Sequence, residues 1–183
     1  SFSISGANLK TAASFNFESQ NSDTIRIRTT DSAGLTYEEA FTITIVDIND
    51  TPSDISLTSN SVKENESLYT IVGALSSTDD DSGDSHTYTL VSGTGDDDNS
   101  SFQKSWHNLL TNAVFNFEVK SSYSIRIRTT DSGGLTYEEA FTITIIDVND
   151  APVLSSIGSK STDEDTPLSF TLSATDEDGH LLT

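Results

Sequence analysis

Carboxylates are the residues of this sequence with the clearest potential for chemistry, and they are clustered rather than spread evenly. Two clusters precede a proline, Asp47-Ile48-Asn49-Asp50-Thr51-Pro52 and Asp147-Val148-Asn149-Asp150-Ala151-Pro152, and they are 150 − 50 = 100 residues apart. Asp79–Asp84 forms a third cluster, which Asp176–Gly179 resembles. Adjacent carboxylates repel one another, so several in one loop lower stability unless something neutralises them. A hard cation that takes about six to eight oxygen ligands, such as Ca²⁺, would do so.

Other acidic positions recur at the same interval. Asn16-Phe17-Glu18 returns as Asn116-Phe117-Glu118, and Asp31 returns as Asp131 at the end of an IRIRTTD segment. Glu64 lies about a dozen residues after the first of the two linker prolines. If the phenylalanines face inward on a strand, the Asn and Glu of each pair share its outer face, about 7 Å apart.

The charge balance restricts the class of partner. The chain carries 29 Asp+Glu against 9 Lys+Arg, a formal net charge of −20. Nucleic acids and anionic membrane surfaces attract basic patches, so neither is an expected partner. The absence of cysteine and of a His–acid–nucleophile pattern argues against an enzyme. No segment is long and apolar enough to span a bilayer, so we predict no membrane insertion by this segment.

A long internal repeat sets the domain organisation. Ile25–Phe41, IRIRTTDSAGLTYEEAF, returns as Ile125–Phe141 with one change, Ala33 to Gly133. The period is about the size of one β-sandwich domain. We therefore predict the second half of a repeat, one complete repeat and the beginning of a further one, at residues 1–50, 51–150 and 151–183.

The apolar residues are spaced as β-strands require. Thr24–Thr29 and Ala40–Ile45 alternate apolar and polar residues, which is typical of half-buried strands. Ser67–Val72 and Thr87–Leu90 are further predicted strands, and no segment keeps a helical period. Roughly seven short strands per repeat predict an all-β protein of tandem Greek-key, immunoglobulin-like β-sandwich repeats of about 100 residues.

The ordered set of motifs resembles cadherin repeats, in the tandem form found in large bacterial surface or secreted proteins. The linkers Asp47–Pro52 and Asp147–Pro152 fit the family's linker motif, and Glu64 fits its early Glu. Asn16–Glu18 and Asn116–Glu118 fit its Asp-x-Glu motif with Asn in place of Asp. The remaining matches are Asp79-x-Asp81 and Asp176-x-Asp178 to the family's Asp-x-Asp, and Asp31 and Asp131 to its last Asp.

The resemblance implies Ca²⁺ bound between successive repeats, where it rigidifies the array. The first junction would draw on Asn16, Glu18, Asp47, Asn49, Asp50, Asp79, Asp81 and Asp131, with Asp84 nearby. The second would draw on Glu64, Asn116, Glu118, Asp147, Asn149, Asp150, Asp176 and Asp178. Asn at positions 16 and 116 removes one charge per junction relative to the family and should weaken a site.

Each motif also has a plainer interpretation. The linkers could be Asx-rich turns before a proline, and Asp79–Asp84 could be a solvated surface loop. Asn116 and Glu118 could lie on a solvated strand face. An EF-hand is excluded at Asp79–Gly83, because the glycine falls one place early and Leu90 stands where the closing Glu should be.

The function that follows is a calcium-binding adhesion or extension module of a cell-surface or secreted protein, which supports homophilic cell adhesion and acts without catalysis. Its partners would be neighbouring cadherin-like repeats, other adhesin molecules or extracellular polysaccharide, and its place the extracellular surface. Two alternatives remain open. One is a calcium-dependent carbohydrate-binding module with a sugar face around Trp106 and Tyr88, and the other is an inert spacer within a larger adhesin.

Overall fold

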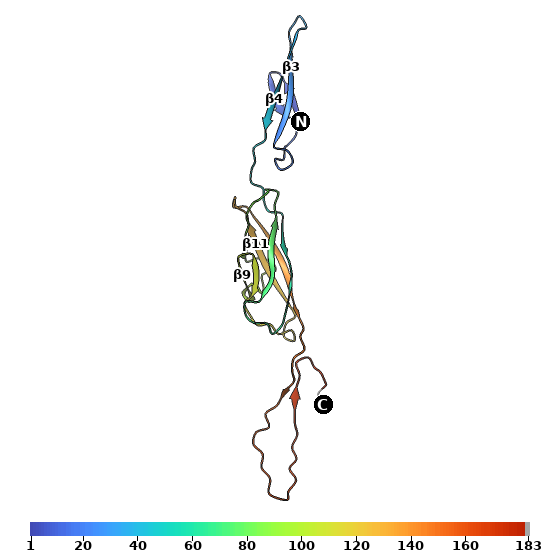
Figure 1. The fold of residues 1–183 in the computed structure, drawn as a ribbon, viewed down its shortest axis with the longest axis vertical. Helices are drawn as coiled ribbons and strands as arrows, with labels where there is room; N and C mark the ends of the chain where they lie inside the picture. Colours follow the sequence, from blue (N-terminus) through green and yellow to red (C-terminus); the bar gives the residue numbers. More distant parts are fainter. Residues whose placement is uncertain (182–183) are drawn as a thin grey trace. The chain divides into compact units, whose positions relative to one another are not determined.

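The computed structural model describes residues 1–181, and within them it is built of β-strands with one short 3₁₀ helix (Figure 1). The described residues divide into two compact units. Unit 1 comprises residues 1–54, 77–87 and 129–137, and unit 2 comprises residues 55–76, 88–128 and the residues from 138 on. This division does not follow the sequence repeat, so the three repeat boundaries stay a prediction.

The complete repeat forms two four-stranded sheets. One sheet has the order β5-β7-β10-β9, and its strands are β5 (Asp54–Leu57), β7 (Ile71–Thr78), β9 (Phe102–Ser105) and β10 (Asn108–Thr111). The other has the order β6-β12-β11-β8, and its strands are β6 (Ser61–Lys63), β8 (Thr87–Leu90), β11 (Ser122–Thr130) and β12 (Thr136–Ile146). Neighbours in each sheet are mostly not consecutive in sequence, because the chain crosses between the sheets as in a Greek key. The 3₁₀ helix Asn99–Ser101 precedes β9.

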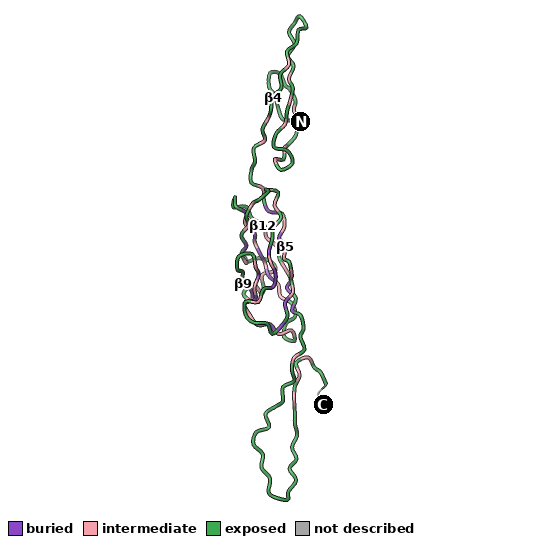
Figure 2. Tube along the Cα trace, in the orientation of Figure 1, coloured by how far each residue is buried: buried purple, intermediate pink, exposed green. Residues whose placement is uncertain are grey.

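The apolar side chains between these sheets form the core of unit 2. From one sheet come Ile55, Val72, Leu75, Phe102 and Leu109, and from the other come Val62, Tyr88, Ile125, Ile127, Ile143 and Ile145, all at most 6% exposed. Figure 2 shows these buried positions in purple along the strands of the complete repeat. The alternation of apolar and polar residues in β11 and β12 is therefore that of half-buried strands, as the sequence predicted, and every second residue faces the opposite sheet.

Residues 1–50 hold two separate two-stranded sheets. They pair β1 (Phe2–Ser5) with β2 (Asn8–Thr11), and β3 (Ser22–Thr30) with β4 (Thr36–Thr44). Ile25 and Ile27 are only half-buried here, whereas Ile125 and Ile127 are buried. Beyond the complete repeat, β13 (Val153–Leu154) pairs with β14 (Ala174–Thr175), and residues 155–173 between them are exposed.

Two local predictions are wrong. Ser67–Val72 is not a strand: Tyr69 has a φ of 70°, which no strand residue adopts, and β7 begins at Ile71. Asn116 and Glu118 do not lie on a strand either. The chain makes a turn there, because Asn116 Oδ1 accepts a hydrogen bond from Val119 N at 2.7 Å, a local bond that competes with a sheet ladder.

Within the described residues, no helix has the length and hydropathy needed to cross a membrane.

Candidate metal centres

The first acidic cluster lies in unit 1 and consists of Glu18, Asp47, Asn49, Asp50, Asp79, Asp81 and Asp131. Oxygen atoms of Glu18, Asp47 and Asp81 all lie within 4.8 Å of one another. Asp50 joins them through its backbone, since its N–H donates to Asp81 Oδ2 at 2.7 Å. Segments far apart in sequence, namely the turn after Phe17, the linker and the loop after β7, thus bring carboxylates to one place.

Asn49 connects the linker to the loop that follows β11. Its Nδ2 donates to Asp131 Oδ2 at 2.9 Å, and Asp131 Oδ1 accepts from Leu135 N at 2.8 Å. Burial raises the pKa of Asp131, but the hydrogen bonds from Asn49 and the backbone outweigh it and lower the pKa overall. A Cβ atom added to Gly133 would lie 2.1 Å from Asn49 Oδ1. Ala33 against Gly133 is the one difference between the segments Ile25–Phe41 and Ile125–Phe141, and the glycine makes room for Asn49.

The loop after β7 supplies the remaining groups. Asp79 Oδ1 accepts a hydrogen bond from Asp81 N at 3.1 Å, and its Oδ2 lies 3.0 Å from His86 Nε2. Asp84 lines a hollow of about 360 Å³ together with Asp47, Asn49 and Asp81. Asp79 and Asp81 are only partly exposed, and carboxylate oxygens of Asp81 lie within 4.8 Å of those of Glu18 and Asp47, whereas Asp79 lies within that distance of Asp84 and His86. The loop is therefore more than a solvated surface loop.

Mutual repulsion affects the titration of the first cluster. Burial, followed by the charges of Asp81, Asp80 and Asp79, raises the pKa of Asp50. A bond from its own backbone N–H favours the charged form of Glu18, but burial and the nearby aspartates outweigh it and raise the pKa of Glu18. Repulsion between these ionised carboxylates therefore destabilises the folded protein, and a bound cation would remove that repulsion.

The second acidic cluster lies in unit 2 and consists of Glu64, Glu118, Asp147, Asn149, Asp150, Asp176 and Asp178. Oxygen atoms of Glu64, Glu118 and Asp150 lie within 4.8 Å of one another, and so do those of Glu118, Asp147 and Asp178. Glu118 belongs to both groups and is the point at which they meet. Asp150 N donates to Asp178 Oδ2 at 2.6 Å.

Glu64 is the buried centre of the second cluster, with 2% of its surface exposed. Its Oε2 accepts from Phe117 N at 2.7 Å and its Oε1 accepts from Val148 N at 2.8 Å. These backbone hydrogen bonds lower the pKa of Glu64, so the carboxylate stays charged in spite of burial. They also join three segments, which are the end of β6, the turn at Phe117 and the linker.

The pKa values of two other acids of this cluster, Asp147 and Glu118, are shifted in the opposite direction, upward. Burial, then the charges of Asp178 and Glu64, raises the pKa of Asp147. For Glu118 a bond from its own backbone N–H opposes the shift, but burial and neighbouring charges raise its pKa. The neighbours of Glu118 are Glu64, Asp147 and Asp178. Uncompensated negative charge is thus a property of both clusters.

The two clusters share their backbone geometry. Asp50 N to Asp81 Oδ2 measures 2.7 Å, and Asp150 N to Asp178 Oδ2 measures 2.6 Å. Asn49 and Asn149 each donate to the carbonyl oxygen of the following aspartate, at 2.9 and 3.0 Å. The linkers are therefore more than Asx-rich turns, since each holds the carboxylate of a distant loop.

Both donor sets suit a hard divalent cation. Oxygens on opposite sides of a Ca²⁺ lie at most about 5 Å apart, so carboxylates within 4.8 Å of one another can share one ion. The arginines and Lys120 form ion pairs elsewhere, with Glu38, Asp98 and Glu138. Among the ion pairs of residues 1–181, those at these clusters involve two histidines, His86 at Asp79 and His180 at Asp176 and Asp178.

Solved structures of cadherin domains resemble this chain over nearly its whole length. Protocadherin gamma B2 extracellular cadherin domains 3–6 match with a TM-score of 0.63 and 23% identity, over 96% of this chain and 44% of that one. The protocadherin gamma B4 extracellular domain matches with a TM-score of 0.63 and 24% identity, over 96% and 30%. The chain has the fold of cadherin extracellular domains.

Sequence relatives agree with the cadherin fold. Chimpanzee protocadherin gamma-A11 is 30% identical over 146 residues, which is 76% of this chain and 15% of that protein. Mouse protocadherin Fat 2 is 32% identical over 145 residues, 74% of this chain and 3% of that protein. The chain therefore spans 15% or less of the length of these two relatives. No protein-family model matches it.

Three predicted ligands, Asn16, Asn116 and Asp31, are not among the carboxylates that converge in the two clusters. The side-chain oxygens of Asn16 and Asn116 accept local hydrogen bonds from Ser19 N at 2.6 Å and from Val119 N at 2.7 Å. Asn116 Nδ2 also donates to Glu177 Oε2 at 2.7 Å, which connects the turn to the distant Asp176–Gly179 loop. Asp31 is exposed, and its Oδ1 accepts from Ala33 N and Leu35 N. The structure does not bring Asp31 to either cluster, although Asp131 in the same local turn belongs to the first.

Sequence reasoning missed several residues at the clusters. Asn65 Nδ2 donates to Asp150 Oδ1 at 2.9 Å from a left-handed backbone position with a φ of 59°. His86 and His180 also lie at the clusters, each beside the Asp-x-Asp loop of its own cluster. The available signal was that each histidine follows an Asp-x-Asp motif within a few residues.

The proposed sugar face does not assemble. Tyr88 is 3% exposed and packs edge-on against His107, with ring centroids 5.7 Å apart. Trp106 is 85% exposed in the turn between β9 and β10, at a φ of 54° where the first repeat has Gly6 at 63°. A buried tyrosine cannot stack on a sugar beside the exposed tryptophan, so the predicted platform is reduced to one residue.

Proposed function

We propose that this chain is a calcium-binding segment of a cadherin-type adhesion protein, in which each acidic cluster binds Ca²⁺ and thereby stiffens the junction between repeats. The observation that carries the proposal is the convergence of carboxylates from separate segments, twice, with the same linker hydrogen bonds. Burial and the neighbouring negative charges raise the pKa of Asp50 and Asp147. Each cluster thus contains repulsion between carboxylates that a bound cation would relieve.

The ligands divide between the clusters as the geometry groups them. At the first cluster we assign Glu18, Asp47, Asn49, Asp50, Asp79, Asp81 and Asp131. At the second we assign Glu64, Glu118, Asp147, Asn149, Asp150, Asp176 and Asp178. Asn16 and Asn116 position the turns that present Glu18 and Glu118, because each amide oxygen accepts a hydrogen bond from the turn backbone. Asp31 is assigned to neither cluster, because its carboxylate accepts only local hydrogen bonds from Ala33 N and Leu35 N.

Adhesion and location follow from the cadherin resemblance. The relatives are protocadherins, and the matching structures are described as their extracellular domains. We infer that this segment lies outside the cell, links to neighbouring cadherin repeats and contributes to homophilic adhesion by binding rather than by catalysis. The relatives named here come from chimpanzee and mouse, so a bacterial origin stays a prediction without support from them.

The two alternatives have less support. A carbohydrate-binding role now depends on Trp106 alone, because Tyr88 is buried. An inert spacer would use the same calcium clusters but would mediate no contact between cells. Beads coated with the protein separate the two roles: adhesion requires that they aggregate in calcium and disperse in chelator, whereas a spacer leaves them dispersed in both.

Calcium titration of two matched variants tests the ligand assignment. Asp150→Ala removes a carboxylate that lies within 4.8 Å of Glu64 and Glu118, whereas Asp97→Ala removes one from an exposed turn. We expect Asp150→Ala to weaken calcium binding at the second cluster about tenfold or more, since even outer partners of metal ligands contribute that much. Isothermal calorimetry of the full chain measures the affinities.

Asp97→Ala is the control and should bind Ca²⁺ as the parent does. Equal affinities in the two variants would remove the basis for the assignment. Failure of the parent chain to bind Ca²⁺ at millimolar concentration would refute the calcium proposal altogether, because extracellular calcium modules bind at about 10⁻⁴–10⁻³ M.

A further inference from the structure

The chain contains three sequences of the type Asn-x-Ser or Asn-x-Thr, which are Asn49-Asp50-Thr51, Asn65-Glu66-Ser67 and Asn99-Ser100-Ser101. In secreted proteins this sequence is the acceptor for N-linked oligosaccharides, provided that the middle residue is not proline. A match this short is common by chance, so the surroundings of each asparagine decide whether a glycan fits. The structure gives the three asparagines different surroundings.

Asn49 cannot accept a glycan without losing a contact in the first acidic cluster. Its Nδ2 donates to Asp50 O and to Asp131 Oδ2, both at 2.9 Å, so both N–H groups of the amide have partners. A glycan replaces one of these two hydrogens and would therefore break one of the two bonds. Pro52 also follows this sequence directly and restricts the backbone of Thr51.

Asn99 is held at both ends of its side-chain amide, where the short 3₁₀ helix begins. Its Nδ2 donates to Val91 O at 2.9 Å, and its Oδ1 accepts from Arg126 N at 2.9 Å. The side chain is half-buried, so these bonds fasten the helix to β11 and to the segment after β8. A bulky glycan on Asn99 would displace the helix from both neighbours.

Asn65 lies in an exposed turn after β6, and its amide keeps one N–H group for a glycan. Its Nδ2 donates to Asp150 Oδ1 at 2.9 Å, and this is the one bond of that nitrogen among the hydrogen bonds of residues 1–181. Glu66 and Ser67 of the same acceptor sequence are exposed as well. The φ of Asn65 is 59°, a left-handed position in which asparagine is more common than most residues.

The residues that follow Asn65 expose apolar side chains to water. Leu68, Tyr69 and Ile71 are 46%, 56% and 58% exposed. Because a chain spans at most about 3.6 Å per residue, the backbone of Leu68 lies within about 11 Å of that of Asn65. N-linked glycans are bulky and solubilising, so one at Asn65 would cover apolar surface that otherwise faces solvent.

We propose that Asn65 carries an N-linked oligosaccharide, and that Asn49 and Asn99 of the folded protein carry none. The sugar comes from an oligosaccharide diphosphate donor. The bond from Asn65 Nδ2 to C1 of the sugar forms, the bond from C1 to the diphosphate oxygen breaks, and the amide loses one proton. The remaining N–H of Asn65 still donates to Asp150, so the glycan lies beside the second acidic cluster without breaking that bond. The proposal rests on the extracellular location inferred above, because N-linked glycans belong to secreted proteins.

Secretion of the full chain from cultured animal cells behind a signal peptide tests the proposal, and glycopeptide mass spectrometry locates the sugar. We expect a glycan on the peptide with Asn65 and none on the peptides with Asn49 or Asn99. Ser67→Ala removes the acceptor sequence but keeps the amide of Asn65, so it should abolish the glycan. The matched change Ser101→Ala should leave the glycan in place. A secreted chain without sugar at Asn65, or with sugar at Asn99, would overturn the proposal.

Translation in the presence of microsomal membranes tests the acceptor even if a variant is not secreted. The mass added to the parent chain should be absent from Ser67→Ala. No added mass that depends on Ser67 would count against Asn65 as the acceptor.

Calcium titration separates this proposal from the calcium function. Protein made in a bacterial host without N-glycosylation tests calcium binding by itself, so either proposal can fail alone. The glycosylated chain and secreted Ser67→Ala should bind Ca²⁺ with the same affinity, because both keep the N–H that bonds to Asp150. A lower affinity of the glycosylated chain would contradict the placement of the sugar on the other N–H.

Discussion

At the scale of single residues, the difference between positions 33 and 133 shows how one methyl group could change the contacts of an acidic cluster. The two turns have the same surrounding sequence, but only the second receives the side chain of Asn49. Asn49 Nδ2 then bonds to Asp131, and this contact joins the linker to the loop after β11. Glycine at position 133 is therefore explained by close approach rather than by an unusual backbone angle.

Gly133→Ala should displace Asn49 and weaken calcium binding at the first acidic cluster about tenfold, as expected for the loss of a partner that orients a ligand. Calorimetry in the Asp150→Ala background isolates the first cluster. The matched control is Ala33→Gly, because Ala33 lies in an exposed turn beside Asp31, outside both acidic clusters. If both variants bind Ca²⁺ as their parent does, the role of Asn49 is wrong.

The acids with shifted pKa values give the calcium-free protein an unusual pH dependence. The pKa values of Glu118 and Asp147 are raised, so the folded protein takes up protons above pH 4.5 that the unfolded chain does not. Stability should therefore increase as the pH falls from 7 toward 4.5. The pKa of Glu64 is lowered, so its contribution is present above pH 4.5 and is lost as the pH falls further.

Urea unfolding of calcium-free protein at a series of pH values measures this curve. With saturating Ca²⁺ the trend above pH 4.5 should disappear or reverse, because cation binding requires deprotonated carboxylates. A calcium-free protein that loses stability steadily from pH 7 downward would contradict the charge repulsion that we infer.

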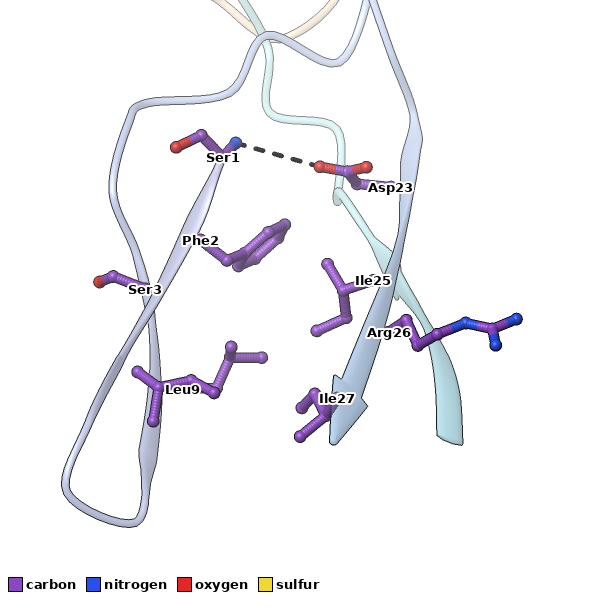
Figure 3. Close-up of a pocket in the computed structure, with 9 residues that line it drawn as sticks. Ser1, Phe2, Ser3, Leu9, Asp23, Ile25, Arg26 and Ile27 are labelled. Carbon is purple, nitrogen blue, oxygen red and sulfur yellow. Dashed lines mark ion pairs between the residues drawn. The ribbon is translucent and has the colours of Figure 1, made fainter. Parts of the chain in front are cut away.

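At the scale of elements, β3 and β11 share the segment IRIRTT but differ in burial. Ile125 is fully buried between two sheets, whereas Ile25 is only half-buried and lines a pocket beside the β1–β2 hairpin (Figure 3). Both strands pair with the hairpin partner that follows them, so their local structure is alike. What differs is the opposite layer of the sandwich, which covers β11 with side chains from β5, β7, β9 and β10.

Ile125→Ala should destabilise the complete repeat by about 2–5 kcal/mol, the range for deleting a fully buried aliphatic side chain. Ile25→Ala should cost less than half as much, since water already reaches that side chain. Denaturant unfolding in saturating Ca²⁺ compares the two. Similar losses would contradict the difference in burial between the two side chains.

At the scale of the whole molecule, we expect bound Ca²⁺ to raise the free energy of unfolding of the chain. Each independent site adds about 2.7 kcal/mol when Ca²⁺ is a hundredfold above its dissociation constant. Ions also cancel the repulsion within each cluster. We therefore expect chelator to lower the melting temperature measured by calorimetry, and to change the maximum dimension measured by small-angle scattering.

Magnesium is the control for that experiment, because it prefers fewer and more rigid ligands than these clusters offer. Equimolar Mg²⁺ should restore little of the stability that chelator removes. If chelator changes neither the melting temperature nor the scattering dimension, the clusters do not serve as calcium junctions.

Several strands of this protein, and most members of its acidic clusters, could be predicted from local sequence patterns. The alternation in IRIRTT predicted β3 and β11, and Thr87–Leu90 predicted β8 residue for residue, because period-2 spacing is dictated by the geometry of a strand. The recurring acids predicted two clusters with most of their members. A repeated sequence carries repeated local structure, so these inferences needed no knowledge of the fold.

Other features were decided only by tertiary structure. The sequence predicted a strand at Ser67–Val72, but Tyr69 is left-handed and its N–H donates to the distant Thr111 O. A strand face was an alternative for Asn116, but the chain turns there, and the turn bonds to the distant Glu64 and Glu177. Asp131 joins a cluster and Asp31 does not, although their local turns match, because only Asp131 meets Asn49. Identical residues acquire different burial, charge and partners here because those properties depend on what packs against them, and neighbours remote in sequence are not encoded in a local pattern.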